Sequence, residues 1–83
     1  MDQFSAQTLA LRALAWIVAD PALGPRLLAL TGLDPAGLRE RAGEPALLGA
    51  TIDFLTQHEP TLIACAEALE TKPETLVAAR GQL

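Results

Sequence analysis

The chain has 83 residues, of which 51% are hydrophobic and 19% charged, and it carries a net charge of -4 at pH 7. This length allows a single domain, and the low share of charged residues excludes a disordered chain. The negative charge argues against non-specific binding to nucleic acid or anionic membranes, because both depend on positive surface charge. Leu and Ala dominate the apolar residues and Tyr is absent, which indicates an all-α fold.

Cysteine content and the N-terminal residues predict the cellular environment. Cys65 is the only cysteine, so no internal disulfide can form and a reducing compartment is expected. The chain starts with Met1-Asp2, an acid at the place where a secretory signal carries positive charge. The longest apolar run, Leu9 to Ala19, contains Arg12 and is shorter than the ~20 residues of a membrane span. We therefore expect a soluble, cytoplasmic protein that does not span a membrane.

The first predicted helix runs from about Ala6 to Ala19, with Ser5 as its N-cap. Only Gln7 and Arg12 mark a clear polar side. One face carries Leu9, Ala13, Trp16 and Ile17, and the rest carries Leu11, Leu14, Ala15 and Val18. A helix that is apolar nearly all round is either central in the fold or covered by another chain.

Acid-proline pairs separate the next two predicted helices. Asp20-Pro21 ends the first helix and opens the second, because Asp suits an N-cap and proline suits the first helical position. Gly32 closes the second helix, where a left-handed conformation costs glycine little. Asp34-Pro35 then opens a third helix to about Ala42, with Leu38 facing inward.

Three more predicted helices follow, and each begins at a pair formed by a charged residue and proline. Glu44-Pro45 opens a helix to about Gln57, Glu59-Pro60 opens the fifth, and Lys72-Pro73 opens the sixth, which ends near Gly81. The residues expected to face inward are Leu48, Ile52 and Leu55 in the fourth helix, Leu62, Ile63, Ala66 and Leu69 in the fifth, and Leu76 and Ala79 in the sixth. The sequence therefore predicts a compact array of six short helices in one domain, residues 1–83.

The positions of these proline pairs also divide the chain into two similar halves. Residues 6–43 and 44–81 each contain three predicted helices separated by an acid-proline pair and a second X-Pro pair. Five residues of the first half align at one constant offset with five of the second: Leu9, Ala13, Trp16, Asp20 and Pro21 with Leu48, Ile52, Leu55, Glu59 and Pro60. This pattern indicates two pseudo-repeated three-helix units.

Four segments of the chain form a recognisable combination. They are Asp20-Pro21 with the run LLALTGLDPAGLR from Leu27 to Arg39, then Asp53-Phe54-Leu55, then His58-Glu59. The combination resembles domain-of-unknown-function family 3572, which consists of small all-helical bacterial proteins. The resemblance covers essentially the whole chain, including the helix start at Pro73-Glu74. It implies a helical fold and no established activity, so it supplies no catalytic residues.

Residues 27–42 also have the layout of a helix-turn-helix motif, in which the second helix enters the major groove. The candidate nucleic-acid contacts are Arg26, Arg39 and Arg41. The positions that would meet the bases are Pro35, Ala36, Gly37 and Glu40, and they contain almost no hydrogen-bond donors. We therefore expect a corner built for packing, and a nucleic-acid-binding regulator remains the alternative function.

No residue pattern predicts catalysis, a metal site or a cofactor. His58-Glu59 lacks the second histidine of the HExxH motif, since position 62 is Leu and Pro60 interrupts the helix. We expect His58 at the end of the fourth helix and Glu59 as the cap of the fifth. Cys65 lies on an apolar face, where burial raises the pKa of a thiol. The sequence therefore predicts no enzyme.

The surplus of apolar faces predicts the function class. So small a core leaves some of these faces uncovered, which favours a protein-protein interaction module that self-associates, for example as a homodimer. The candidate interface residues are Trp16, Leu11 and Leu14. Trp16 is expected mainly in the core, and the alternative is an anchor in an interface, where tryptophan is enriched.

Overall fold

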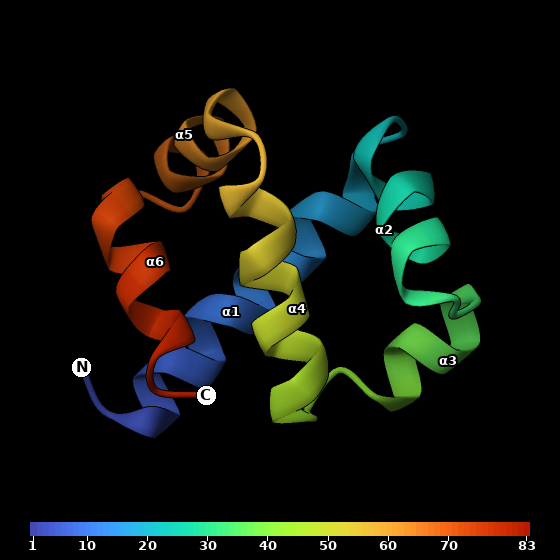
Figure 1. Cartoon of the computed structure of the whole chain (residues 1–83), viewed down its shortest axis with the longest axis horizontal. Coiled ribbons are helices and arrows are strands. Elements are labelled where there is room, and N and C mark those ends of the chain that lie inside the picture. Colours follow the sequence, from blue (N-terminus) through green and yellow to red (C-terminus); the bar gives the residue numbers. More distant parts are fainter.

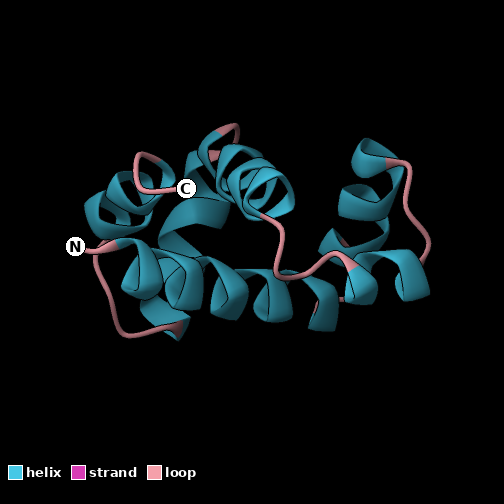
Figure 2. Cartoon of the chain, turned by 90° about the horizontal axis from the view of Figure 1, so that it is seen from below, coloured by secondary structure: helices cyan, strands magenta, loops and turns pink.

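A computed structural model describes residues 1–83 and contains six helices and no strand (Figures 1 and 2). The helices are α1 (Gln3–Ala19), α2 (Leu23–Thr31), α3 (Pro35–Glu40), α4 (Pro45–Thr56), α5 (Glu59–Ala68) and α6 (Pro73–Arg80). The predicted all-α fold with six helices is therefore confirmed.

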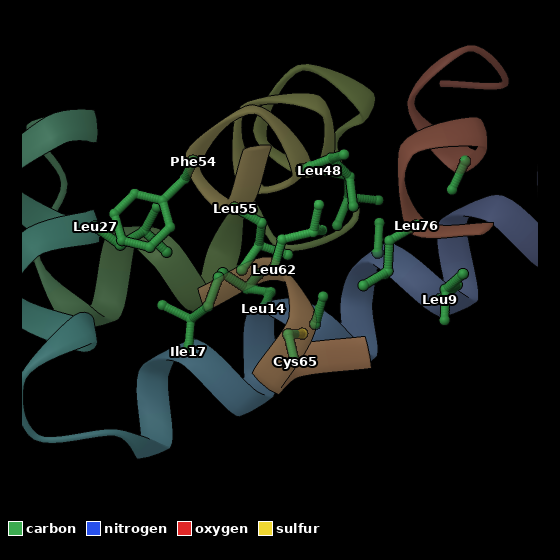
Figure 3. Packing of buried hydrophobic residues seen from close by; sticks show 14 of the residues in the cluster. Leu9, Leu14, Ile17, Leu27, Leu48, Phe54, Leu55, Leu62, Cys65 and Leu76 are labelled. Atoms are coloured by element: carbon green, nitrogen blue, oxygen red, sulfur yellow. The ribbon is translucent and has the colours of Figure 1, made fainter. Parts of the chain in front are cut away.

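The two longest helices, α1 and α4, form the centre of the molecule. Figure 1 shows α4 crossing α1, with α5 and α6 on one side and α2 and α3 on the other. The predicted stripe Leu48, Ile52 and Leu55 on α4 is buried against α1, α5 and α6. In Figure 3, side chains from α1, α4 and α5 converge in the middle of this core. Burial of these apolar side chains is the main force that stabilises the fold.

The last helix of each half packs differently. α6 packs against α1, α4 and α5, and its residues Leu76 and Ala79 are fully buried, as predicted. α3 packs extensively against no other helix, and Leu38 is its only buried residue. Consequently α2 and α3 form an extension at one end of the molecule, visible in Figure 2. The pseudo-repeat of residues 6–43 and 44–81 stays a prediction.

Two of the predicted helix boundaries are confirmed by their capping residues. Gly32 has a φ of 74° and closes α2 in the left-handed conformation, as predicted. The Oδ1 atom of Asp34 accepts a hydrogen bond of 2.6 Å from the Gly37 amide and caps α3. The prediction for α1 was wrong, because Oδ1 of Asp2 accepts from the amide of Ser5 at 2.6 Å. Asp2 is thus the N-cap, and Ser5 lies within the helix.

Two further boundaries differ from the prediction. The Asp20 carboxylate accepts hydrogen bonds from the amides of Ala22 at 2.8 Å and Leu23 at 3.0 Å, which forms a turn before α2. Pro21 therefore lies in this turn and not in the first helical position. The third helix ends at Glu40 and not at Ala42, because residues 41–43 form a turn that leads to α4.

Part of the predicted core of α5 was also assigned wrongly. Leu62 and Ala66 are buried as predicted, and Leu69 is half-buried. Ile63, however, is 40% exposed. The reason is that the short helix buries only one face, the face of Leu62, Cys65 and Ala66, and Ile63 lies outside it.

The apolar length of the helices also bears on membrane insertion. No single helix is long and apolar enough to cross a membrane. α1 and α2 meet these criteria of length and composition only when taken together, as a pair bent by 115°.

Candidate functional site

α1 is the longest helix, and its exposed side carries a row of large apolar residues. Its inner side is filled with small residues, among them Ala6, Ala10 and Ala13, which allow α4 and α6 to approach closely. Its outer side carries three large apolar residues that remain in solvent. Phe4 is 78% exposed, Leu11 45% and Val18 49%. The three positions are seven apart in the sequence, about two helical turns, so all three lie on one side of the helix.

A groove of about 380 Å³ lies beside this exposed side, between α1, α2 and α3. Leu11, Leu14 and Val18 of α1 form one part of its lining. Leu28 of α2 and Leu38 of α3 form the opposite part. The volume and the mainly apolar lining are those of binding pockets in other proteins.

Gly24 explains how α2 comes close enough to close the groove. A Cβ atom at Gly24 would lie 3.1 Å from the carbonyl oxygen of Val18 at the end of α1. This separation is tighter than ordinary van der Waals contact, so a larger residue would push α2 away from α1.

A second depression of about 200 Å³ continues the groove toward the N-terminus of α1. It shares Leu11 and Ala42 with the first and adds Phe4 and Thr8 to the lining. At a rise of 1.5 Å per residue, the α1 segment from Phe4 to Val18 is ~21 Å long. The two depressions together form what we call the α1 groove.

The structure brings together two of the three predicted interface residues. Leu11 is exposed in the α1 groove, and Leu14 forms its floor with only 4% of its surface exposed. Trp16 is half-buried against the core and does not line the groove. Sequence reasoning missed Phe4 and Val18, which lie seven positions before and after Leu11.

The three arginines predicted as candidate nucleic-acid contacts have different surroundings. Arg39 lines the α1 groove, where it is the only charged residue and no carboxylate accompanies it. Arg41 is exposed at the C-terminal end of α3. The guanidinium of Arg26 lies 5.8 Å from the centre of the Phe54 ring on α4. Arg26 is thus engaged in a cation–π contact within its own chain.

The remaining polar candidates show structural roles. His58 precedes α5 as its N-cap residue, and its Nδ1 atom lies 2.7 Å from Oγ1 of Thr61. Glu59 is the first residue of α5 and not its cap, contrary to the prediction. Cys65 is fully buried, and desolvation raises the pKa of its thiol to about 11. No three His, Cys, Asp or Glu side chains lie close enough together to hold a metal ion.

Another depression, of about 600 Å³, lies between α5 and α6 and has a different character. Ile63 and Val77 supply its apolar part, and Glu59 and Glu74 line it as well. It therefore combines exposed apolar atoms with two carboxylates, whereas the α1 groove carries one cation and no acid.

Comparison with known proteins identifies the family. Residues 3–83 match the family described as "Protein of unknown function (DUF3572)". The chain belongs to the DUF3572 family. The match spans nearly the whole DUF3572 chain, so the resemblance found in its sequence is confirmed. None of the curated proteins and none of the solved structures compared with this DUF3572 protein matches it.

Proposed function

We propose that this DUF3572 protein is a protein-interaction module that binds its partner through the α1 groove. The observation that carries the proposal is the line of Phe4, Leu11 and Val18, exposed beside an apolar groove. Contiguous apolar surface of this kind on a small protein marks interaction sites more often than isolated exposed residues do.

The small size of the core supports the proposal. Only 21 of the 83 residues are buried, and seven large hydrophobic residues remain exposed. Removing a large side chain such as Phe4 from water contributes about 1.5–3 kcal/mol when burial is complete. A partner in the α1 groove would therefore add substantially to the few kcal/mol that hold so small a domain together.

A photo-crosslinking amino acid tests this function in living cells. We place it at Leu11 or Val18 in the α1 groove, and at Ile63 or Val77 in the depression between α5 and α6 as matched controls. All four residues are apolar and 40% to 49% exposed, so they differ mainly in location. We expect a discrete protein adduct from the first two positions and none from the controls. Equal labelling at all four positions, or no adduct at Leu11 and Val18, would count against the proposal.

The alternative function, nucleic-acid binding through residues 27–42, has less support. α3 has only six residues, and the positions that would meet bases carry Pro35, Ala36 and Gly37. Fluorescence anisotropy with duplex DNA of mixed sequence tests the alternative directly. Binding through phosphate contacts weakens as the salt concentration rises, and we expect no binding of this kind. Tight binding that is lost in Arg39→Ala would favour the alternative over the protein partner.

A further inference from the structure

We infer that the partner of the α1 groove is a second copy of this chain, with the two α1 helices antiparallel across a two-fold axis. This inference rests on the proposed function, because it uses the same surface. It adds the identity of the partner, the direction of the two helices and the residues that face one another.

The exposed residues of α1 include a regularly spaced row. Six of them, in α1 and the segment before it, recur at intervals of 3, 4, 3, 4 and 3, with Ser5 and Arg12 exposed beside the row: Met1, Phe4, Thr8, Leu11, Ala15 and Val18. Alternating intervals of three and four are those of the core positions in a two-helix coiled coil. None of the six side chains is charged, and the α-amino group of Met1 lies at one end of the row. A helix already covered by its own domain has no need of a second, outward seam of this kind.

The intervals 3, 4, 3, 4 and 3 have the same order in both directions along α1. An antiparallel copy can therefore be aligned so that every seam residue meets a seam residue, with the two-fold axis between Thr8 and Leu11. In this alignment Phe4 faces Ala15 of the second copy, and Leu11 faces Thr8. Large residues thus meet smaller ones in successive layers, which is the arrangement that allows side chains to interdigitate. A parallel alignment would instead place Phe4 on Phe4 and Ala15 on Ala15, which matches sizes poorly.

α1 carries very little charge. Arg12 is the only charged residue within α1, and its guanidinium donates a hydrogen bond of 3.1 Å to the carbonyl oxygen of Leu69 in its own chain. In the antiparallel alignment the two-fold axis keeps Arg12 of both copies on the same edge of the seam, where each guanidinium stays bound to Leu69 of its own chain. The two helix dipoles also oppose each other in this arrangement, whereas a parallel pair would align them. The six seam side chains carry no charge, so a second copy meets no opposed pair of like-charged side chains within the seam itself.

The α1 groove runs along the same side of α1 as the seam. The depressions of about 380 Å³ and 200 Å³ lie along the seam and meet at Leu11. Leu11 is therefore central both in the groove and in the proposed contact.

Sedimentation equilibrium of the purified chain provides the first test. We expect a dimer, and Leu11→Glu should weaken dimerisation on the order of 100-fold or more, because symmetry places the change twice in one contact. Val77→Glu is the matched control and should leave the dimer unchanged, since Val77 has the same exposure far from the seam, at 46% against 45%. Circular dichroism checks that both variants remain helical. A chain that stays monomeric at high concentration overturns the inference.

Disulfide trapping tests the direction of the helices without a disruptive charge. In a Cys65→Ala background, Phe4→Cys and Ala15→Cys chains should form a disulfide dimer when mixed, because facing Cβ atoms in a close pair approach disulfide range. Each variant alone should form little. Self-crosslinking of Phe4→Cys alone, without a mixed product, would overturn the antiparallel arrangement. A monomeric chain that nevertheless gives a photo-adduct from Leu11 with another protein would overturn this inference and leave the proposed function standing.

Discussion

The side chains of Arg80 and Asp53 join α6 to α4 at the surface of the molecule. Nε of Arg80 donates to Oδ1 of Asp53 at 3.1 Å, and about half of each side chain is exposed. Exposed pairs of this kind contribute only about 0.2–1 kcal/mol. The guanidinium also lies over Gly49, where a Cβ atom would be 2.8 Å from Cζ of Arg80. Arg80 therefore occupies the space that a side chain at position 49 would need.

The first prediction concerns the coupling between Gly49 and Arg80. In an Arg80→Ala background, Gly49→Ala should raise the free energy of unfolding by about 1 kcal/mol, the difference between alanine and glycine within a helix. In the native background the gain should be smaller, because Arg80 must move and its contact with Asp53 weakens. Urea denaturation of the four chains measures this difference. Equal gains in both backgrounds would show that the two positions are not coupled.

The second prediction compares two leucines of α2. Leu27 is fully buried and Leu30 is 57% exposed. Leu27→Ala should lower the free energy of unfolding by about 2–5 kcal/mol, because it leaves a cavity in the core. Leu30→Ala should change it by no more than about 0.5 kcal/mol. Thermal and urea unfolding measure both, and similar losses for the two variants would contradict the packing of α2.

The third prediction concerns the end of α5, where Glu70 has a φ of 55°. The amide of Glu70 donates to the carbonyl oxygen of Glu67, and the amide of Thr71 donates to that of Ala66. This is the Schellman arrangement, in which the left-handed position is usually glycine. Glu70→Gly should therefore leave stability unchanged or raise it by up to about 1 kcal/mol, since the strain of a side chain at positive φ disappears.

Glu67→Gly is the matched control for that prediction. It makes the same chemical change three residues earlier, inside α5. It should lower the free energy of unfolding by about 1 kcal/mol, because glycine is a poor helix former. If both variants were destabilised equally, the left-handed conformation of Glu70 would not be strained.

The fourth prediction concerns the dependence of stability on alkaline pH. Burial raises the pKa of the Cys65 thiol from 9.0 to about 11, so the unfolded chain releases this proton at lower pH than the folded chain. The stability that the neutral thiol contributes is therefore complete below pH 9 and is lost as the pH rises toward 11. Lys72 is the only lysine and the chain has no tyrosine, so few other side chains titrate in this range.

Urea denaturation across this pH range compares the native chain with Cys65→Ala. The native chain should lose stability more steeply with rising pH than the variant does. The same thiol should also react slowly with alkylating reagents at neutral pH, because the thiolate is the reactive form. Parallel pH profiles for the two chains would contradict the assigned burial.

Residues that act through local chemistry could be predicted from the sequence. Gly32 and Asp34 were assigned correctly because a left-handed C-terminal glycine and an Asp N-cap depend only on neighbouring backbone. The stripe on α4 was also correct, since its spacing and its burial agree. The predicted start of α1 was wrong because Asp and Ser are both favoured N-cap residues. The spacing of the apolar residues that follow does not distinguish Asp2 from Ser5.

The candidate site required the three-dimensional structure. On a helix as apolar as α1, the sequence does not show which apolar side faces the core, so Phe4 and Val18 could not be separated from Ile17. Similarly, Ile63 and Leu62 are neighbours of equal hydrophobicity, and only the positions of α4 and α6 decide which is buried. The groove itself depends on the angle at which α2 and α3 leave α1, which no local pattern encodes.

The packing of α1 against α6 has a consequence for folding during synthesis. α1 leaves the ribosome before α6, yet their buried faces cover each other. At about 5–20 residues per second, translation leaves α1 without this neighbour for several seconds. Any chain that ends before Leu76 lacks a fully buried side chain of α6. We therefore expect the core to close only after α6 has left the ribosome.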